Sequence, residues 1–86
     1  MQIIFTDNFK KKFRALPQKI KNQFEKRLGV FIKDPLNPLL KIHPLKGNMI
    51  GLRAFSITGD YRTIYRLLNH ECAELIDIGT HSKIYK

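Results

Sequence analysis

The sequence has 86 residues, of which 43% are hydrophobic and 10% aromatic. This length leaves room for one domain, residues 1–86, and the apolar content excludes a disordered tail. Sixteen Lys and Arg residues stand against seven Asp and Glu residues, which gives a net charge of +9. Such an excess favours a polyanionic partner: nucleic acid, an anionic membrane or an acidic protein.

Three features bear on the compartment. No apolar run approaches the ~20 residues that cross a bilayer. The segment from Met1 to Phe5 lacks the basic, apolar and small-residue regions of a signal peptide. The single cysteine, Cys72, has no second cysteine to pair with and is interpreted as a small strand residue. We therefore expect a cytoplasmic protein with no membrane partner.

The N-terminal third predicts a strand followed by two helices. Gln2 to Phe5 is a short apolar strand, and Thr6 or Asp7 can cap the helix after it. Apolar residues then recur every three or four positions from Phe9 to Phe31, which is typical of one buried helical face. Pro17 is incompatible with a helix interior, so the pattern predicts a helical hairpin over 7–33 that breaks near Leu16-Pro17.

Residues 36–48 contain several prolines and a glycine and are predicted to form a loop. From Met49 the pattern alternates and predicts strands over 50–57, 61–68 and 72–79. Short polar turns separate these strands, as in an antiparallel meander. The expected fold class is α+β: an N-terminal strand and a helical hairpin packed on a twisted antiparallel β-sheet.

Strand parity predicts where polar groups gather. Arg62 and Arg66 share one face of their strand, and because arginine is costly to bury, that face should be open. If the next turn centres on Asn69-His70, Arg62 lies opposite Asp77. His81 then projects from the same face, provided that the strand stays extended. Ser56 of the preceding strand joins this surface, and the helices cover the other side.

These residue types suit RNA cleavage. A base must take the 2′-hydroxyl proton, a cation must neutralise the phosphorane, and an acid must protonate the leaving 5′-oxygen. Arg62 suits the second role, His81 either proton role, and Tyr85 can stack on a base. The histidines and the cysteine lack metal-ligand spacing, and no glycine-rich phosphate loop is present. No metal or small-molecule cofactor is expected.

Three segments carry a family resemblance: Leu45-Lys46-Gly47, Gly59 to Arg66, and Ile78 to Tyr85. In order and spacing they resemble the RelE/ParE toxin superfamily of bacterial toxin–antitoxin pairs. Within it the sequence looks closest to the YafQ branch of ribosome-dependent messenger-RNA endonucleases. The resemblance implies a RelE-like fold, cleavage of mRNA in the ribosomal A site with a 2′,3′-cyclic phosphate product, and a cognate antitoxin.

The resemblance also implies site residues. His43 falls where the YafQ branch has a catalytic histidine, Asp60 on its acidic residue, His81 on its principal histidine and Tyr85 on an aromatic. Arg62 instead matches the phosphate-binding arginine of RelE-type members.

One position departs from the YafQ pattern. A further histidine of that branch falls on Ser56, whose hydroxyl cannot act as a general base by itself. His81 should therefore carry more of the proton chemistry, with His43 as its helper. The residues predicted to contact RNA outside the catalytic set are Arg53, Arg66, Lys46, Lys83 and Ser56.

Two other functions remain open at this point. A ParE-like inhibitor of DNA gyrase would share the fold and the basic charge without a nuclease site. A catalytically inactive RNA-binding module would bind ribosomes without cleaving mRNA. The favoured prediction is an endoribonuclease toxin that acts on mRNA at the ribosome and is held by a cognate antitoxin.

Overall fold

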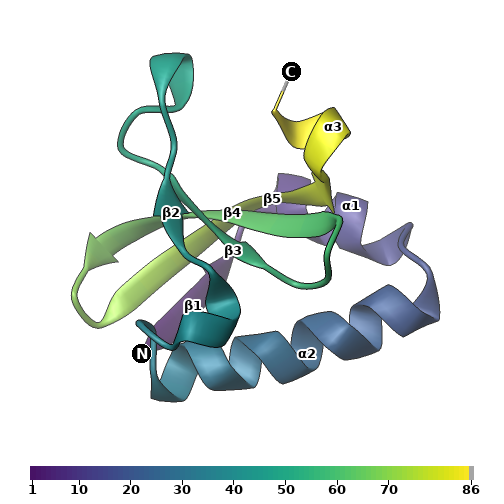
Figure 1. Cartoon of the computed structure of the whole chain (residues 1–86), viewed down its shortest axis with the longest axis horizontal. Coiled ribbons are helices and arrows are strands. Elements are labelled where there is room, and N and C mark those ends of the chain that lie inside the picture. The colour runs from purple at the N-terminus through teal and green to yellow at the C-terminus, as the bar shows by residue number, and fades with distance from the viewer. Residues whose placement is uncertain (86) are drawn as a thin grey trace.

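The computed structural model describes residues 1–85, which form one five-stranded sheet with helices around it (Figure 1). The sheet order is β1-β5-β4-β3-β2. The strands are β1 (Gln2–Phe5), β2 (His43–Pro44), β3 (Arg53–Ser56), β4 (Tyr61–Asn69) and β5 (Cys72–Thr80). The helices are α1 (Asp7–Arg14), α2 (Gln18–Lys33) and α3 (His81–Ile84), with single 3₁₀ turns η1 (Pro38–Leu40) and η2 (Gly47–Met49). The predicted α+β class is confirmed.

Strands β3, β4 and β5 form the predicted antiparallel meander. Strand β1 adds to it in parallel, with Gln2 opposite Cys72, so β5 has a partner on both sides. At the other edge β2 pairs with β3, His43 lying opposite Ala54. The prediction of an unbroken loop over 36–48 was therefore wrong at these two residues. Pro44 is tolerated because an edge strand leaves one side of its backbone unpaired.

The helical hairpin breaks where the sequence predicts. Pro17 precedes α2, and Thr6 caps α1 by accepting a hydrogen bond from the Phe9 N–H at 3.1 Å. The Thr6 hydroxyl also donates to the Leu75 carbonyl at 2.9 Å, which fixes the start of α1 against β5. Within residues 1–85, no helix has the length and apolar character needed to cross a membrane.

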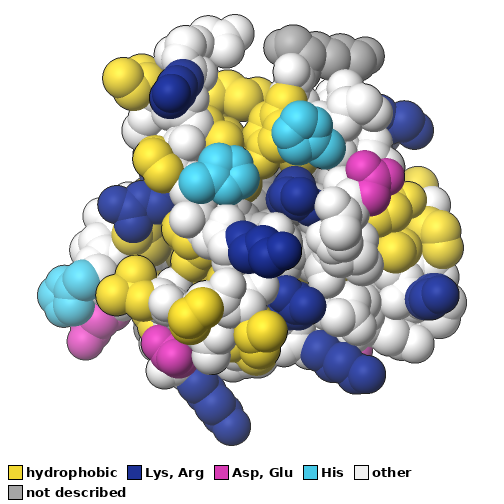
Figure 2. All heavy atoms as spheres, viewed as in Figure 1, with side chains coloured by type: hydrophobic (Ala, Val, Ile, Leu, Met, Phe, Trp, Pro, Cys, Tyr) yellow, Lys and Arg dark blue, Asp and Glu magenta, His cyan; other side chains and the backbone are white. Residues whose placement is uncertain are grey.

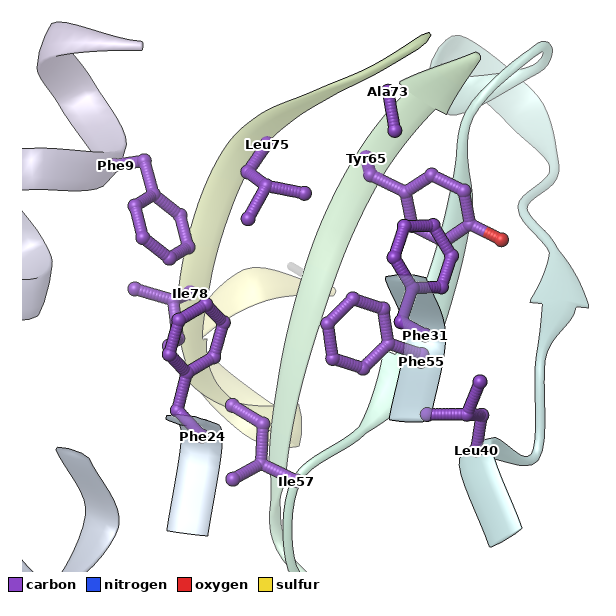
Figure 3. Close-up of a cluster of buried hydrophobic side chains, with 10 residues drawn as sticks. All are labelled: Phe9, Phe24, Phe31, Leu40, Phe55, Ile57, Tyr65, Ala73, Leu75 and Ile78. Atoms are coloured by element: carbon purple, nitrogen blue, oxygen red, sulfur yellow. The ribbon is translucent and has the colours of Figure 1, made fainter. Parts of the chain in front are cut away.

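An aromatic core joins the helices to one face of the sheet (Figure 3). Phe31 of α2 stacks on Phe55 of β3 with ring centroids 5.0 Å apart, and it meets Tyr65 of β4 edge-on at 4.9 Å. Phe24 extends the cluster toward Phe9 of α1, at 5.4 Å. In Figure 1, α2 lies below the sheet, α1 lies behind it near β5, and α3 and the segment around η2 project on the side opposite α2.

The register of the β4–β5 hairpin corrects one prediction. Asn69 pairs with Cys72, so the turn centres one residue later than assumed, on His70-Glu71. Arg62 therefore lies opposite Gly79, whereas Asp77 lies opposite Ile64 and pairs with Lys12 at 2.8 Å. Shifting a turn by one residue moves the register by two, which preserves the face. The predicted Arg62–Asp77 pairing was wrong, but the face of Arg62 was right.

Two strand ends also differ from the prediction. Strand β3 begins at Arg53, because Gly47–Met49 form a 3₁₀ turn and Gly51 has a φ of 91°, a region that favours glycine. Strand β5 ends at Thr80, and the chain turns into α3 at His81 instead of staying extended.

Candidate active site

Two histidines and a tyrosine from distant segments meet above the sheet, and we call His43, His81 and Tyr85 the His–Tyr cluster. The His81 and Tyr85 rings lie edge to face with centroids 4.5 Å apart. The His43 and Tyr85 rings are 6.3 Å apart, with Tyr85 Oη 3.5 Å from His43 Nε2. Tyr85 therefore stands between two imidazole rings, each with nitrogens that can donate or accept a hydrogen bond.

The short helix α3 sets the geometry of His81 and Tyr85. Residues four apart lie on the same side of a helix, which places these two rings together. The His81 N–H donates to the Asp60 carbonyl at 2.9 Å, so the start of α3 is held by the turn between β3 and β4. Ile84, only 5% exposed, packs over Gly79 of β5. One backbone hydrogen bond and one buried side chain thus hold α3 against the sheet.

His43 is oriented by its own segment. Its Nδ1 lies 3.2 Å from the Lys41 carbonyl oxygen, which can only accept a hydrogen bond. A proton on Nδ1 satisfies this contact and leaves Nε2 with a free lone pair in the neutral ring. Nε2 faces the Tyr85 hydroxyl and can accept its hydrogen bond or take a proton from a substrate.

Tyr85 has a perturbed phenol. Partial burial raises its pKa above the ordinary value of 10.0, and the nearby charge of Arg62 partly opposes this shift. The hydroxyl is therefore protonated at neutral pH and is available as a hydrogen-bond donor. The influence of Arg62 on Tyr85 also shows that the guanidinium is close to the His–Tyr cluster.

Arg62 is fixed by the turn that precedes its strand. Its Nη1 lies within 2.9–3.1 Å of the carbonyl oxygens of Thr58, Gly59 and Tyr61. These contacts all involve Nη1, so Nη2 and Nε have no protein partner within residues 1–85 and remain for an anion. A planar guanidinium in this state suits a phosphate.

The face of the molecule that carries the His–Tyr cluster is basic as well as rich in histidine. Figure 2 shows histidine side chains close to Lys and Arg side chains on the side where α3 and the η2 segment project. Across residues 1–85, no group of three or more His, Cys, Asp and Glu side chains is arranged to hold a metal ion. The arrangement offers proton transfer and anion binding within one small area.

A family model described as "Bacterial toxin of type II toxin-antitoxin system, YafQ" matches residues 1–86. The chain belongs to this family. The predicted resemblance to the YafQ branch is thereby confirmed. No curated protein sequence matches the chain.

Solved structures of YafQ and related toxins have the same fold. YafQ from E. coli strain BL21(DE3) superposes with a TM-score of 0.81 at 22% identity, over 99% of this chain and 98% of that one. YafQ in the E. coli DinJ–YafQ toxin–antitoxin complex gives 0.79 at 22% identity, over 99% and 97%. A YoeB/ParE toxin from Agrobacterium tumefaciens gives 0.77 at 22% identity, over 94% and 99%.

In this YafQ-family toxin, the five predicted catalytic residues converge on one area. His43, His81 and Tyr85 form the cluster, and Arg62 lies beside Tyr85. Asp60 takes part through its backbone, whose carbonyl holds the His81 N–H, while its side chain is exposed. The assumption that β5 extends through His81 was wrong, yet α3 delivers His81 to the predicted side.

The predicted RNA contacts are more scattered. Ser56 lies opposite Arg62 and is buried beside it, and Lys46 is exposed just before η2. Arg66 forms an ion pair with Glu74 at 2.6 Å, toward the far end of β4.

Arg53 and Lys83 lie outside the cluster. Arg53 pairs with Tyr65 on the helix-covered face, and its charge partly offsets the rise in the Tyr65 pKa that burial causes. Lys83, two positions from His81 on α3, lines a different hollow together with Lys12. The structure thus places Ser56 beside Arg62, near the His–Tyr cluster, but neither Arg53 nor Lys83.

Sequence analysis missed two contributors. Lys41 orients His43 through its carbonyl, and its φ of 49° is left-handed, which no local residue pattern signals. Helix α3 did leave a signal, because the four-residue spacing from His81 to Tyr85 is a helical period. A single pair of residues at this spacing is too short a signal to outweigh the apolar pattern of the preceding strand.

Proposed function

We propose that this YafQ-family toxin is a metal-independent, ribosome-dependent mRNA endonuclease that inhibits translation. The observation that supports it is the convergence of His43, His81 and Tyr85 beside Arg62. In the reaction the 2′-oxygen attacks the phosphorus and loses its proton to one histidine. The bond to the 5′-oxygen breaks, and this oxygen takes a proton from a second group, leaving a 2′,3′-cyclic phosphate.

Each side chain has a role in this proposal. Arg62 binds the non-bridging phosphate oxygens and stabilises the charge of the phosphorane. His81 transfers a proton and His43 assists, since its Nε2 can accept one. Tyr85 donates from its neutral hydroxyl and positions the substrate base, and Asp60 holds the start of α3.

Substitution of the cluster tests the proposal. Because a positioned acid or base typically contributes about 10²–10⁴-fold, His81→Ala should reduce mRNA cleavage by about a hundredfold or more. Arg62→Ala should have an effect of about 10²–10³-fold, the usual loss for one transition-state donor. The measurement is growth after induction, together with mapping of new mRNA 5′ ends in the same cells.

His70→Gln is the matched control, because His70 is exposed in the β4–β5 turn. It should cleave as the parent does. Since Arg62 also binds the turn, thermal unfolding of Arg62→Ala must show that the fold persists. If His81→Ala and Arg62→Ala both cleave translated mRNA at the parent rate, the site is wrong. DNA breaks mediated by gyrase, with mRNA intact, would instead identify a ParE-like inhibitor.

The proposal includes a cognate antitoxin. The E. coli relative was solved in a toxin–antitoxin complex with DinJ. This chain has a net charge of +9, which favours an acidic antitoxin and attraction to ribosomal and messenger RNA. Action on translating ribosomes makes the cytoplasm the proposed place of action.

A further inference from the structure

A cleft of about 640 Å³ opens between α2, η1 and the turn that joins β3 to β4. Its volume lies within the roughly 300–1,000 Å³ range of small-ligand sites. Arg62 lines this cleft and is also the cation beside Tyr85. The cleft therefore adjoins the His–Tyr cluster through a shared side chain.

The cleft carries cations from three separate elements. Arg27 of α2, Lys41 after η1 and Arg62 of β4 line it, and none of its lining residues is acidic. Arg27 Nη1 donates to the Leu39 carbonyl at 2.6 Å, which fixes its guanidinium at the cleft and leaves its other N–H groups for a ligand. Cations held together without a counter-charge attract an anion.

Lys41 caps the C-terminal end of η1 in the left-handed conformation, and its backbone N–H donates to the Pro38 carbonyl at 3.2 Å. It is the only non-glycine residue within 1–85 with a positive φ, at 49°. Glycine would adopt this conformation at lower cost, yet a lysine occupies the position. Strain of this kind is concentrated at functional sites. The lysine side chain at the cleft is the feature that glycine would not supply.

The rest of the lining suits a nucleobase. Leu39 is 58% exposed and, with the exposed Pro38, forms an apolar wall. Gln23 and Asn37 add amide groups, which can meet the polar edge of a base. A nucleotide has a flat apolar ring, a polar base edge and an anionic phosphate. These three parts match the apolar wall, the amide groups and the cations of the cleft.

We propose that the cleft binds one nucleotide of the single-stranded RNA next to the scissile phosphate. Arg27 and Lys41 hold its phosphate, and the apolar wall contacts its base. Arg62 connects this subsite to the reacting phosphate. The inference rests on the proposed endonuclease function for its substrate, but it concerns residues outside the catalytic group.

Binding of a labelled RNA oligonucleotide with 2′-O-methyl groups tests the subsite, because such RNA cannot undergo 2′-hydroxyl attack. Arg27→Ala and Lys41→Ala should each weaken binding by about tenfold. Each should also lower the slope of log Kd against log salt by about 0.7, the value for one phosphate contact on a single strand. The matched control is Lys26→Ala, the neighbour of Arg27 on α2, which loses the same charge outside the cleft.

Lys41→Gly separates binding from folding. Glycine relieves the positive φ, so thermal stability should hold or rise while RNA binding falls as in Lys41→Ala. Equal losses in Arg27→Ala and Lys26→Ala would overturn the subsite, since they would indicate diffuse attraction. So would unchanged oligonucleotide binding with weakened sedimentation on ribosomes, which would assign these cations to ribosomal contacts. Failure of the endonuclease proposal would appear separately, as cleavage that His81→Ala does not reduce.

Discussion

At the scale of single residues, Arg62 connects local structure to chemistry. One of its nitrogens lies close to three carbonyls at the β3–β4 turn, and the residue also lines the cleft and acts by its charge on Tyr85. The Asp60 carbonyl in that same turn holds the start of α3. Lysine offers a single point charge. An Arg62→Lys change would therefore lose both the planar fork that suits a phosphate and some of the hydrogen bonds to the turn carbonyls.

Tyr65 gives a prediction at alkaline pH. Its side chain is 1% exposed, and burial raises the pKa of its phenol above 10.0 although Arg53 partly opposes the shift. A raised folded-state pKa means that the stabilisation is complete below the unfolded pKa and is lost as pH rises through the folded pKa. The wild type should therefore lose stability above about pH 10 that Tyr65→Phe retains.

Urea unfolding of both proteins at about pH 8 and about pH 11 measures this effect. From the lower to the higher pH, the wild type should lose more of its free energy of unfolding than Tyr65→Phe does. All other ionisable groups are common to both proteins, so their contributions cancel in the comparison. A difference that stays constant across this range would show that Tyr65 does not control the alkaline transition.

At the scale of elements, α3 depends on the absence of a side chain beneath it. A Cβ at Gly79 would lie 3.0 Å from Ile84 Cγ2. Because Ile84 is buried and branched, Gly79→Ala should displace α3 by a few tenths of an ångström and carry His81 and Tyr85 with it. We expect cleavage to fall by about tenfold, since small misplacements of catalytic groups are costly, while the unfolding free energy changes by less than about 2 kcal/mol.

Gly29→Ala on α2 is the control, because a Cβ there meets nothing within 4 Å and its backbone is not left-handed. Cleavage by both variants is measured beside thermal unfolding. If Gly79→Ala cleaves as Gly29→Ala does, the contact between Gly79 and Ile84 does not set the position of the proposed catalytic side chains.

Elements with enough residues to show a period could be predicted from the sequence. Apolar residues recur several times at a helical period in α2 and at a strand period in β4 and β5. Pro17 marks the break between the two helices. Strand β2 has two residues and α3 has four, so neither develops a pattern. The hairpin register depended on where one turn centres, which composition alone leaves open.

The same limit applies to the site. Residue type identified His81, Tyr85 and Arg62 as suited to RNA chemistry, and parity put Arg62 on the correct face. The meeting of His43 with Tyr85 joins positions 42 residues apart and depends on the edge strand β2. The cleft depends on the packing of α2 beside the β3–β4 turn, and no local pattern encodes it.

At the scale of the whole molecule, stability depends on few large side chains. Phe31 is 0% exposed and contacts both Phe55 and Tyr65. Phe31→Ala should cost about 3–5 kcal/mol, a large share of the roughly 5–15 kcal/mol that stabilises a typical domain. Phe31→Leu keeps most of the volume and should cost less. Thermal unfolding measures both, and equal midpoints would contradict the central place of this ring.

The placement of β5 has a consequence for synthesis. This strand follows the other four in the chain, yet it lies between β1 and β4, and Thr6 bonds to Leu75 across 69 positions. Translation at about 5–20 residues per second must deliver β5 before the sheet can close. The residues of α3 emerge later still. A nascent chain therefore cannot assemble the His–Tyr cluster until β5 has left the exit tunnel.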